Sequence, residues 1–190
     1  LGLRDGVVFP VYGLAEATLF VSGGPRGRTP RVVALDAVAF RSGRVAVADA
    51  KAGKEIKTVV SSGPPWLDTE IAVVDAESEK PLSPDHVGEI WVRSPSVGSG
   101  YLNRPDETER VFDARLADDG GEGFLRTGDL GFVHDGELFV TGRLKDVLIV
   151  AGQNHAPQDL ELAAEGSHPA LRANGGAAFA YEHGGRESIG

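Results

Sequence analysis

Short apolar runs separated by turn-forming residues make up most of the chain. The clearest pair, 131–133 and 138–140, flanks an Asp-Gly dipeptide within residues 134–137. This pattern predicts a tight β-hairpin, because both central residues of such a turn need a positive φ. A charged, unpatterned connector at 143–146 then separates the hairpin from the apolar run 147–150. A connector of this kind is typical of an exposed hinge.

The remaining runs predict further strands and two helices. The predicted strands are 7–11, 31–35, 43–47, 56–60, 69–75, 88–93 and 177–181. Helices are predicted at 104–110 and 157–165, because a proline opens each segment and acidic residues follow in the first turn. The second helix should end at Gly166. We therefore expect an α/β chain with α+β elements, whose second small α/β unit begins near Lys145.

Composition excludes several classes of function. The net charge of −9, without a basic stripe, argues against nucleic-acid binding. The absence of cysteine excludes disulfides, thiolate metal sites and cysteine nucleophiles. No apolar run approaches the ~20 residues of a membrane helix, so we expect no stable membrane insertion and a cytoplasmic protein. The chain begins with leucine rather than methionine, and we expect an internal piece of a longer protein.

Two places in the chain offer polar chemistry. The expected strand 7–11 leads through a tight turn to Glu16 and Thr18, and ligands of open α/β folds bind just beyond strand ends. Taken alone, Glu16 could equally be a solvated residue of a helical turn. The second place is Asp129, in a Thr-Gly-Asp turn at the mouth of the hairpin. Its two acceptor oxygens match vicinal ribose hydroxyls, although aspartate in such a turn is more often a turn or cap residue.

Other chemistries have little support in the sequence. The five histidines do not pair at a ligand spacing such as i, i+4, so no structural zinc is expected. No G-x-S-x-G elbow is present, which argues against a hydrolase. The glycine-rich segment 22–27 lacks the spacing of a phosphate-binding P-loop and is interpreted as a plain loop.

Four motifs carry a resemblance to a known superfamily. TGDLG at 127–131, GRLKD at 142–146, GQNHAP at 152–157 and YGLAEAT at 12–18 resemble the adenylate-forming enzymes, which include acyl-CoA synthetases, peptide-synthetase adenylation domains and luciferases. Within that superfamily, YGLAEAT, GQNHAP and the segment 31–63 are most similar to the fatty acyl-AMP ligases. The similarity covers essentially the whole chain.

The resemblance implies a domain organisation. Residues 1–144 would be the C-terminal portion of a large N-terminal domain, with an insertion at about 31–60 and a distorted β-barrel at about 64–142. Residues 145–190 would begin a mobile C-terminal domain that turns about Lys145. The family's phosphate loop and its adenylation lysine would lie outside the 190 residues, so we expect the isolated chain to have no catalytic activity.

The resemblance also implies roles for single residues in an ATP/AMP site. Tyr12 would lie against the adenine, with Gly13 in the same turn, and Thr18 would contact the α-phosphate. Glu16 would help to bind Mg²⁺, and hard oxygen ligands suit this ion. Glu16 and Thr18 are the implied catalytic residues.

Two more residues would complete the nucleotide site. Asp129 would accept hydrogen bonds from the ribose hydroxyls, and Arg143 would donate to the ribose or to the phosphates. Lys145 is implied to be a pivot and not a catalytic residue.

The implied activity is the activation of a fatty acid with ATP and Mg²⁺ to acyl-AMP and pyrophosphate. The acyl group would then pass to an acyl carrier protein of a polyketide or peptide synthase, because the insertion at 31–60 disfavours transfer to coenzyme A in this family. The main alternative is a fatty acyl-CoA ligase. A second alternative, from another class, is a non-catalytic nucleotide- or carrier-binding module.

Overall fold

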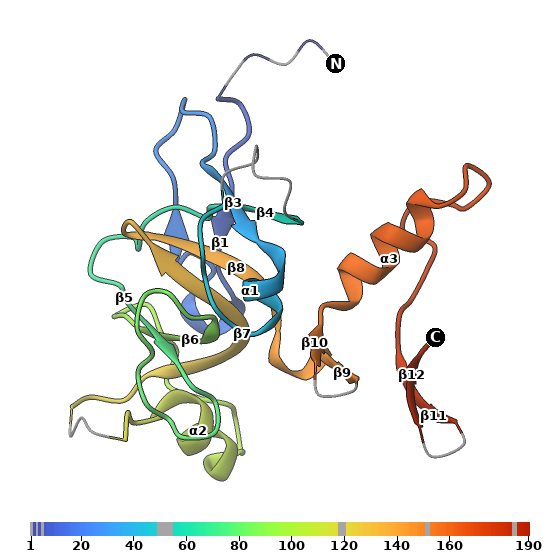
Figure 1. Cartoon of the computed structure of the whole chain (residues 1–190). Helices are drawn as coiled ribbons and strands as arrows, with labels where there is room; N and C mark the ends of the chain where they lie inside the picture. The colour runs from blue at the N-terminus through green and yellow to red at the C-terminus, as the bar shows by residue number, and fades with distance from the viewer. Residues whose placement is uncertain are drawn as a thin grey trace. The chain divides into compact units, whose positions relative to one another are not determined.

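The computed structural model describes residues 2, 4, 6–48, 55–117, 121–150, 153–183 and 186–190. The chain forms two compact units, Leu1–Thr141 and Gly142–Gly190. Figure 1 shows their elements, which are described below for each unit by itself.

A four-stranded antiparallel sheet is the centre of the first unit. Its order is β5-β6-β7-β8, with bounds Glu70–Val74, Gly88–Arg93, Leu125–His134 and Glu137–Arg143. The strands predicted at 69–75 and 88–93 are therefore confirmed. The distorted barrel expected at about 64–142 is, within the described residues, an open sheet, because β5 and β8 lie at opposite ends of the strand order.

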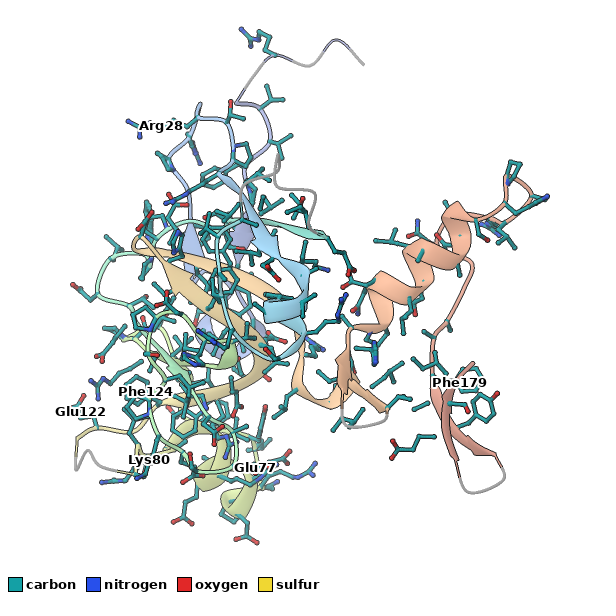
Figure 2. All side chains as sticks on the ribbon, in the orientation of Figure 1. Arg28, Glu77, Lys80, Glu122, Phe124 and Phe179 are labelled. Atoms are coloured by element: carbon teal, nitrogen blue, oxygen red, sulfur yellow. The ribbon has the colours of Figure 1, made fainter. Side chains whose placement is uncertain are left out.

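The two faces of this sheet bury different side chains. Along β6, Ile90 and Val92 belong to one core cluster and Trp91 to another, because successive side chains of a strand point to opposite faces. α2 (Pro105–Phe112) covers the first face through Val111 and Phe112. This helix begins with proline at its first position and carries acids in its first turn, as the sequence predicted. On the other face the ring of Phe124, labelled in Figure 2, lies 6.3 Å from that of Trp91.

The hairpin of β7 and β8 has the predicted turn. Asp135 and Gly136 have φ values of 50° and 77°, so both central residues are left-handed, as a tight hairpin of this type requires. Phe132 and Phe139, one on each strand, stack with their ring centroids 4.9 Å apart and are fully buried. The hairpin is therefore both tightly turned and anchored in the core.

The described residues of the segment 31–60 pack on this hairpin. β3 (Val32–Asp36) and β4 (Ile56–Val60) pair antiparallel, and α1 (Ala37–Arg41) follows β3 directly. The sequence did not predict α1, whose start is capped by the Asp36 carboxylate accepting from two backbone N–H groups. The strand expected at 43–47 is reduced to isolated bridges, because the chain turns away after α1. Val33, Leu35 and Val59 share a core cluster with the two stacked phenylalanines.

The prediction of a buried strand at 7–11 was wrong. Only β1 (Val11–Tyr12) forms, paired with β2 (Ser22–Gly23), and Val7 and Val8 are exposed. The reason is that β2 offers just two residues for pairing, so the preceding valines gain no strand partner. The helical turn expected after β1 is a short 3₁₀ helix, η1 (Ala15–Ala17).

The described residues of the second unit form two small hairpins, a short 3₁₀ helix and an α-helix. Its elements are η2 (Leu144–Asp146), β9 (Leu148–Val150), β10 (Gln153–His155), α3 (Pro157–Gly166), β11 (Ala180–His183) and β12 (Arg186–Ile189). β9 pairs with β10, and β11 with β12, both antiparallel. The predicted helix is present but includes Gly166 as its last residue, and the strand predicted at 177–181 begins later. No helix in the described part of the chain is long and apolar enough to cross a membrane.

Candidate functional site: the Tyr12 turn and the Asp129 bulge

The loop after β1 folds back on Gly13. A Cβ atom at this position would lie 1.2 Å from the carbonyl oxygen of Leu19, so no other residue fits there. Thr18 and Leu19 have φ values of 54° and 74°, and the Leu19 N–H donates to the Leu14 carbonyl. The loop is thus a closed turn that begins at Tyr12 and carries Glu16 and Thr18.

The Thr-Gly-Asp motif is a β-bulge inside β7. Arg126 pairs with Trp91 and Leu130 with Glu89, so the three residues 127–129 lie opposite the single residue Ile90. The expectation of a turn at the mouth of the hairpin was wrong, because strand pairing continues on both sides of the motif. Gly128 supplies the left-handed backbone of the bulge, with a φ of 70°.

The bulge brings Asp129 to the Tyr12 turn. The Tyr12 hydroxyl donates a hydrogen bond of 2.8 Å to Asp129 Oδ2 across 117 residues of sequence. Both side chains are buried, with exposed fractions of 8% for Tyr12 and 6% for Asp129. A carboxylate has about four acceptor positions, more than the bond from Tyr12 occupies by itself. The two motifs that the sequence proposed for one nucleotide site are therefore in direct contact.

Glu16 lies in contact with a residue that the sequence reasoning missed. The Tyr101 hydroxyl donates to Glu16 Oε1 at 2.8 Å, and its ring packs edge-on against Phe112. Burial, followed by the hydrogen bond to Glu16, raises the pKa of Tyr101 above its ordinary value. The N–H of Gly98 donates to the Glu16 carbonyl. Both the backbone and the carboxylate of Glu16 are thus held in place.

Thr18 is tied to the loop that follows β6. Its hydroxyl donates to the Ser96 carbonyl at 2.7 Å, and the residue is exposed to solvent. Neither Ser96 nor Tyr101 carried a signal in the sequence, because both lie in a small-residue loop with no motif of their own.

Arg143 and Lys145 belong to the second unit. Arg143 is the last residue of β8, and Lys145 is the central residue of η2. The residues gathered within the first unit are Tyr12, Gly13, Glu16, Thr18 and Asp129.

Glu16 is the residue that the sequence proposed as a metal ligand. No group of three or more histidine, cysteine, aspartate or glutamate residues in the described part of the chain could hold a metal ion. A single held carboxylate nevertheless suits Mg²⁺, which is usually bound through one or two carboxylates together with phosphate oxygens of the substrate.

A cavity of about 470 Å³ opens elsewhere in the first unit. Its charged lining residues are Asp68, Glu70, Arg93 and Glu122. None of the residues that the sequence proposed for the nucleotide site lines this cavity. Arg93 spans it, donating to the Glu70 carboxylate and to the Glu122 carbonyl.

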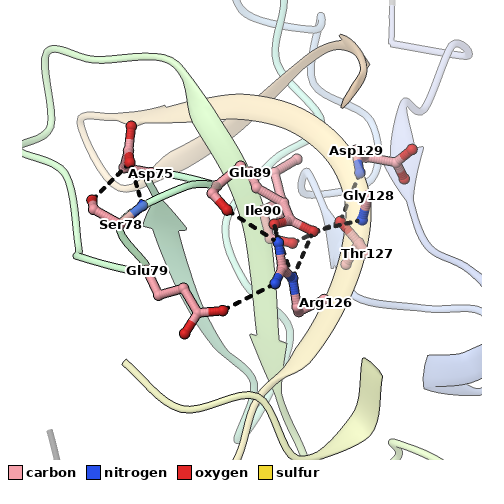
Figure 3. Close-up of polar contacts among 10 residues, drawn as sticks. Asp75, Ser78, Glu79, Glu89, Ile90, Arg126, Thr127, Gly128 and Asp129 are labelled. Carbon is pink, nitrogen blue, oxygen red and sulfur yellow. Dashed lines mark hydrogen bonds and ion pairs between the residues drawn. The ribbon is translucent and has the colours of Figure 1, made fainter. Parts of the chain in front are cut away.

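The buried ion pair of Glu89 and Arg126 contacts the backbone of the bulge. Glu89 is 2% exposed and accepts from Arg126, and its other oxygen accepts from the backbone N–H of Gly128 (Figure 3). The sequence reasoning did not single out either residue. The available signal was a glutamate inside the apolar run 88–93, where a charge rarely lies without a partner.

Comparison with known proteins gives a consistent result. Residues 3–102 match the family model described as AMP-binding enzyme. A medium-chain-fatty-acid–[acyl-carrier-protein] ligase, JamA of Moorena producens, is 49% identical over 189 residues, which cover 99% of this chain and 32% of that protein. A long-chain-fatty-acid–AMP ligase, FadD32 of Mycolicibacterium smegmatis, is 38% identical over 188 residues, which cover 94% of this chain and 30% of that protein.

A solved structure has the same fold. The crystal structure of a fatty acyl-adenylate ligase from L. pneumophila, in complex with acyl adenylate and pyrophosphate, matches with a TM-score of 0.70 and 41% identity. The match covers 99% of this chain and 32% of that one. The chain thus spans about a third of the length of the proteins it resembles.

Proposed function

The chain belongs to the AMP-binding enzymes, and from this premise we propose that it is part of a longer fatty acyl-AMP ligase. A fatty acid carboxylate attacks the α-phosphorus of ATP, a new P–O bond forms, and pyrophosphate leaves. The thiol of an acyl carrier protein then attacks the acyl carbonyl, and AMP leaves. Names of similar proteins, which include a carrier-protein ligase and an AMP ligase, support both half-reactions.

The observation that carries this proposal is the contact between Tyr12 and Asp129. A nucleoside needs a flat apolar face for its base and a hydrogen-bond acceptor for its ribose. The turn at Tyr12 and the bulge at Asp129 bring these two groups within one hydrogen bond. We assign the ribose hydroxyls to Asp129 and the adenine to Tyr12, with Gly13 allowing the loop to close behind the base.

Glu16 and Thr18 serve the phosphates in this proposal. Glu16 holds Mg²⁺, which neutralises phosphate charge when it is bound. The Tyr101 hydroxyl fixes the direction of the Glu16 carboxylate. Thr18 donates to the α-phosphate once its hydroxyl turns from the Ser96 carbonyl.

Arg143 and Lys145 have separate parts. Arg143 donates to the ribose or to the phosphates with its planar guanidinium, and Lys145 is the pivot about which residues 145–190 move between the two half-reactions. The boundary between the two compact units lies after Thr141, next to these residues, which supports a hinge in this part of the chain.

The acceptor is a carrier protein and not coenzyme A. We assign the restraining insertion to residues 31–60, whose strands share a core cluster with the hairpin β7–β8 that leads to the hinge. This packing lies within the first unit, and it supports the assignment only in that it ties β3 and β4 to the hairpin whose second strand leads to the hinge. We also propose a cytoplasmic location, where ATP is available.

The test uses the full-length enzyme that contains this chain. It is incubated with ATP, Mg²⁺ and a panel of fatty acids, followed by coenzyme A or a carrier protein, and the products are identified by mass spectrometry. We expect acyl-AMP that persists with coenzyme A and is consumed by the carrier protein. Rapid formation of acyl-CoA would favour the acyl-CoA ligase, and the lack of any adenylate would favour a binding module.

A matched pair of variants ties the activity to the site. Asp129→Asn should raise the KM for ATP and reduce the preference for ATP over 2′-deoxy-ATP, because its acceptor capacity and charge both fall. Glu122→Gln, which changes an acid at the separate cavity, should leave both values unchanged. Equal behaviour of the two variants would contradict the role of Asp129.

A further inference from the structure

The β-bulge at residues 127–129 leaves backbone groups that the strand ladder cannot pair. Three of them are satisfied by two side chains. The Thr127 hydroxyl donates to the Ile90 carbonyl at 2.6 Å and accepts from the Asp129 N–H at 3.1 Å. Glu89 Oε1 accepts from the Gly128 N–H at 3.2 Å. Because buried backbone groups must find partners, these bonds set the path of the bulge.

Glu89 is an unusual residue for this task, because it is a carboxylate that is 2% exposed. Its charge is matched by Arg126, whose Nη2 and Nε atoms lie 2.7 Å and 3.2 Å from Oε2. The Arg126 guanidinium also lies 5.1 Å from the centre of the Trp91 ring and donates to Glu79. Oε2 takes the two shorter bonds from Arg126, and Oε1, which also lies 3.4 Å from Arg126 Nε, accepts from the Gly128 N–H (Figure 3).

We propose that Glu89, held by Arg126, is a positioning residue for nucleotide binding, because it fixes the bulge that aims the Asp129 carboxylate at the ribose. This inference rests on the proposed function. Figure 3 shows the Asp129 side chain pointing away from the Glu89–Arg126 pair, so the pair acts on Asp129 through the backbone and not by contact.

The same sheet contains a natural control for a purely structural ion pair. Arg93 donates to Glu70 at 2.6 Å and 3.0 Å, and its guanidinium lies 4.3 Å from the centre of the Phe124 ring. This pair also joins neighbouring strands, β5 and β6, and also stacks on an aromatic ring. It differs in two respects: neither residue hydrogen-bonds to the bulge, and the Glu70 side chain is 55% exposed, against 2% for Glu89.

The test compares Glu89→Gln, Asp129→Asn and Glu70→Gln in the full-length enzyme. Steady-state kinetics give the KM for ATP, the KM for the fatty acid, and the ratio of kcat/KM for ATP to that for 2′-deoxy-ATP. Glu89→Gln should raise the KM for ATP at least about tenfold, the range expected for losing a charged hydrogen bond. It should lower the ATP preference as Asp129→Asn does and leave the KM for the fatty acid unchanged. Glu70→Gln should behave as wild type.

A second pair of variants covers the case in which Glu89→Gln does not fold. Thr127→Val removes the hydroxyl that bridges the bulge without changing charge or size, and it should reproduce the rise in the KM for ATP. Thr127→Ser keeps the hydroxyl and should restore wild-type kinetics. A rise for Thr127→Val that serine abolishes supports a bulge that positions Asp129.

The outcomes separate the two proposals. If Asp129→Asn alters the ATP preference while Glu89→Gln and Thr127→Val do not, the positioning role is wrong and the ribose contact stands. If Asp129→Asn itself leaves the ATP preference unchanged, the ribose contact is wrong and the positioning role falls with it. A lower kcat with an unchanged KM for ATP in Glu89→Gln would indicate a structural role only and would also overturn the inference.

Discussion

The hydrogen bond from Tyr12 to Asp129 joins two segments that lie 117 residues apart, and Tyr12→Phe removes the hydroxyl that donates it. The phenylalanine ring keeps the packing of Tyr12 in the core cluster with Ala17, Val21 and Leu138. The substitution therefore isolates the contribution of the hydroxyl to the stability of the first unit.

The expected loss follows from the charge and burial of the acceptor. A hydrogen bond to a charged group contributes about 1.5–3 kcal/mol, and only 6% of Asp129 is exposed, so little water is at hand to replace the donor. We therefore expect Tyr12→Phe to lower the free energy of unfolding by about 2 kcal/mol. In an Asp129→Asn background the same change should cost about 0.5–1.5 kcal/mol, because the bond is then between neutral groups.

The assay is urea unfolding of the 190-residue chain followed by tryptophan fluorescence. Both tryptophans, Trp66 and Trp91, lie in the first unit, so the signal reports on that unit and not on residues 142–190. The matched control is Tyr101→Phe, which removes a hydroxyl bond of the same 2.8 Å length to the partly exposed Glu16. Because water can replace that bond, the control should cost less than about 1 kcal/mol.

Equal losses for the two variants would refute the reasoning. They would mean that burial of the Tyr12–Asp129 pair adds nothing to the bond. An unchanged stability for Tyr12→Phe would mean that the two motifs are not joined by this contact in solution.

Three further substitutions test the turn, the core and the hairpin. In the same assay, Gly13→Ala should lower the free energy of unfolding by about 3 kcal/mol or more, because the new Cβ would lie 1.2 Å from a backbone carbonyl oxygen. The control Gly24→Ala, whose new Cβ would have no atom within 4 Å, should leave the free energy of unfolding nearly unchanged. Phe139→Ala should cost about 3–5 kcal/mol, because it removes a fully buried ring from a stacked pair; a loss below about 1 kcal/mol would contradict the packing of 31–60 on the hairpin. The hydrogen bond from Arg31 lowers the pKa of Asp135, so the stability from this pair is present above the ordinary aspartate range and is lost as the pH falls through the lowered value. Arg31→Gln should therefore raise the pKa of Asp135 in an NMR titration, and an unchanged value would exclude the ion pair.

Local pattern was sufficient where neighbouring residues decide the structure. The hairpin turn at Asp135 and Gly136 was predictable, because its left-handed backbone depends on two adjacent residues. The start of α2 was predictable because proline and acids favour the first turn of a helix wherever they lie. The strand at Gly88–Arg93 was predictable from its own composition.

The residue pattern gave wrong predictions where pairing with another strand determines the structure. The apolar run 7–11 has strand-forming residues, yet only two residues of β2 pair with it. The Thr-Gly-Asp motif resembles a turn by composition, and the pairing of Arg126 and Leu130 with β6 makes it a bulge. Neither result can be read from the segment itself, because it depends on another strand: β2, about ten residues further on, for the run 7–11, and β6 for the bulge.

For the candidate site, the sequence by itself determined which residue types are available to the proposed chemistry: an aromatic ring at Tyr12, carboxylates at Glu16 and Asp129, and the family motifs around them. Only the tertiary structure decided that the Tyr12 hydroxyl meets Asp129, and that the buried Glu89 accepts from Gly128 in the bulge that contains Asp129. The physical reason is that residue type fixes what a side chain can donate or accept, whereas its partner depends on the path of another chain segment, 117 residues away for Tyr12 and Asp129 and 39 for Glu89 and Gly128.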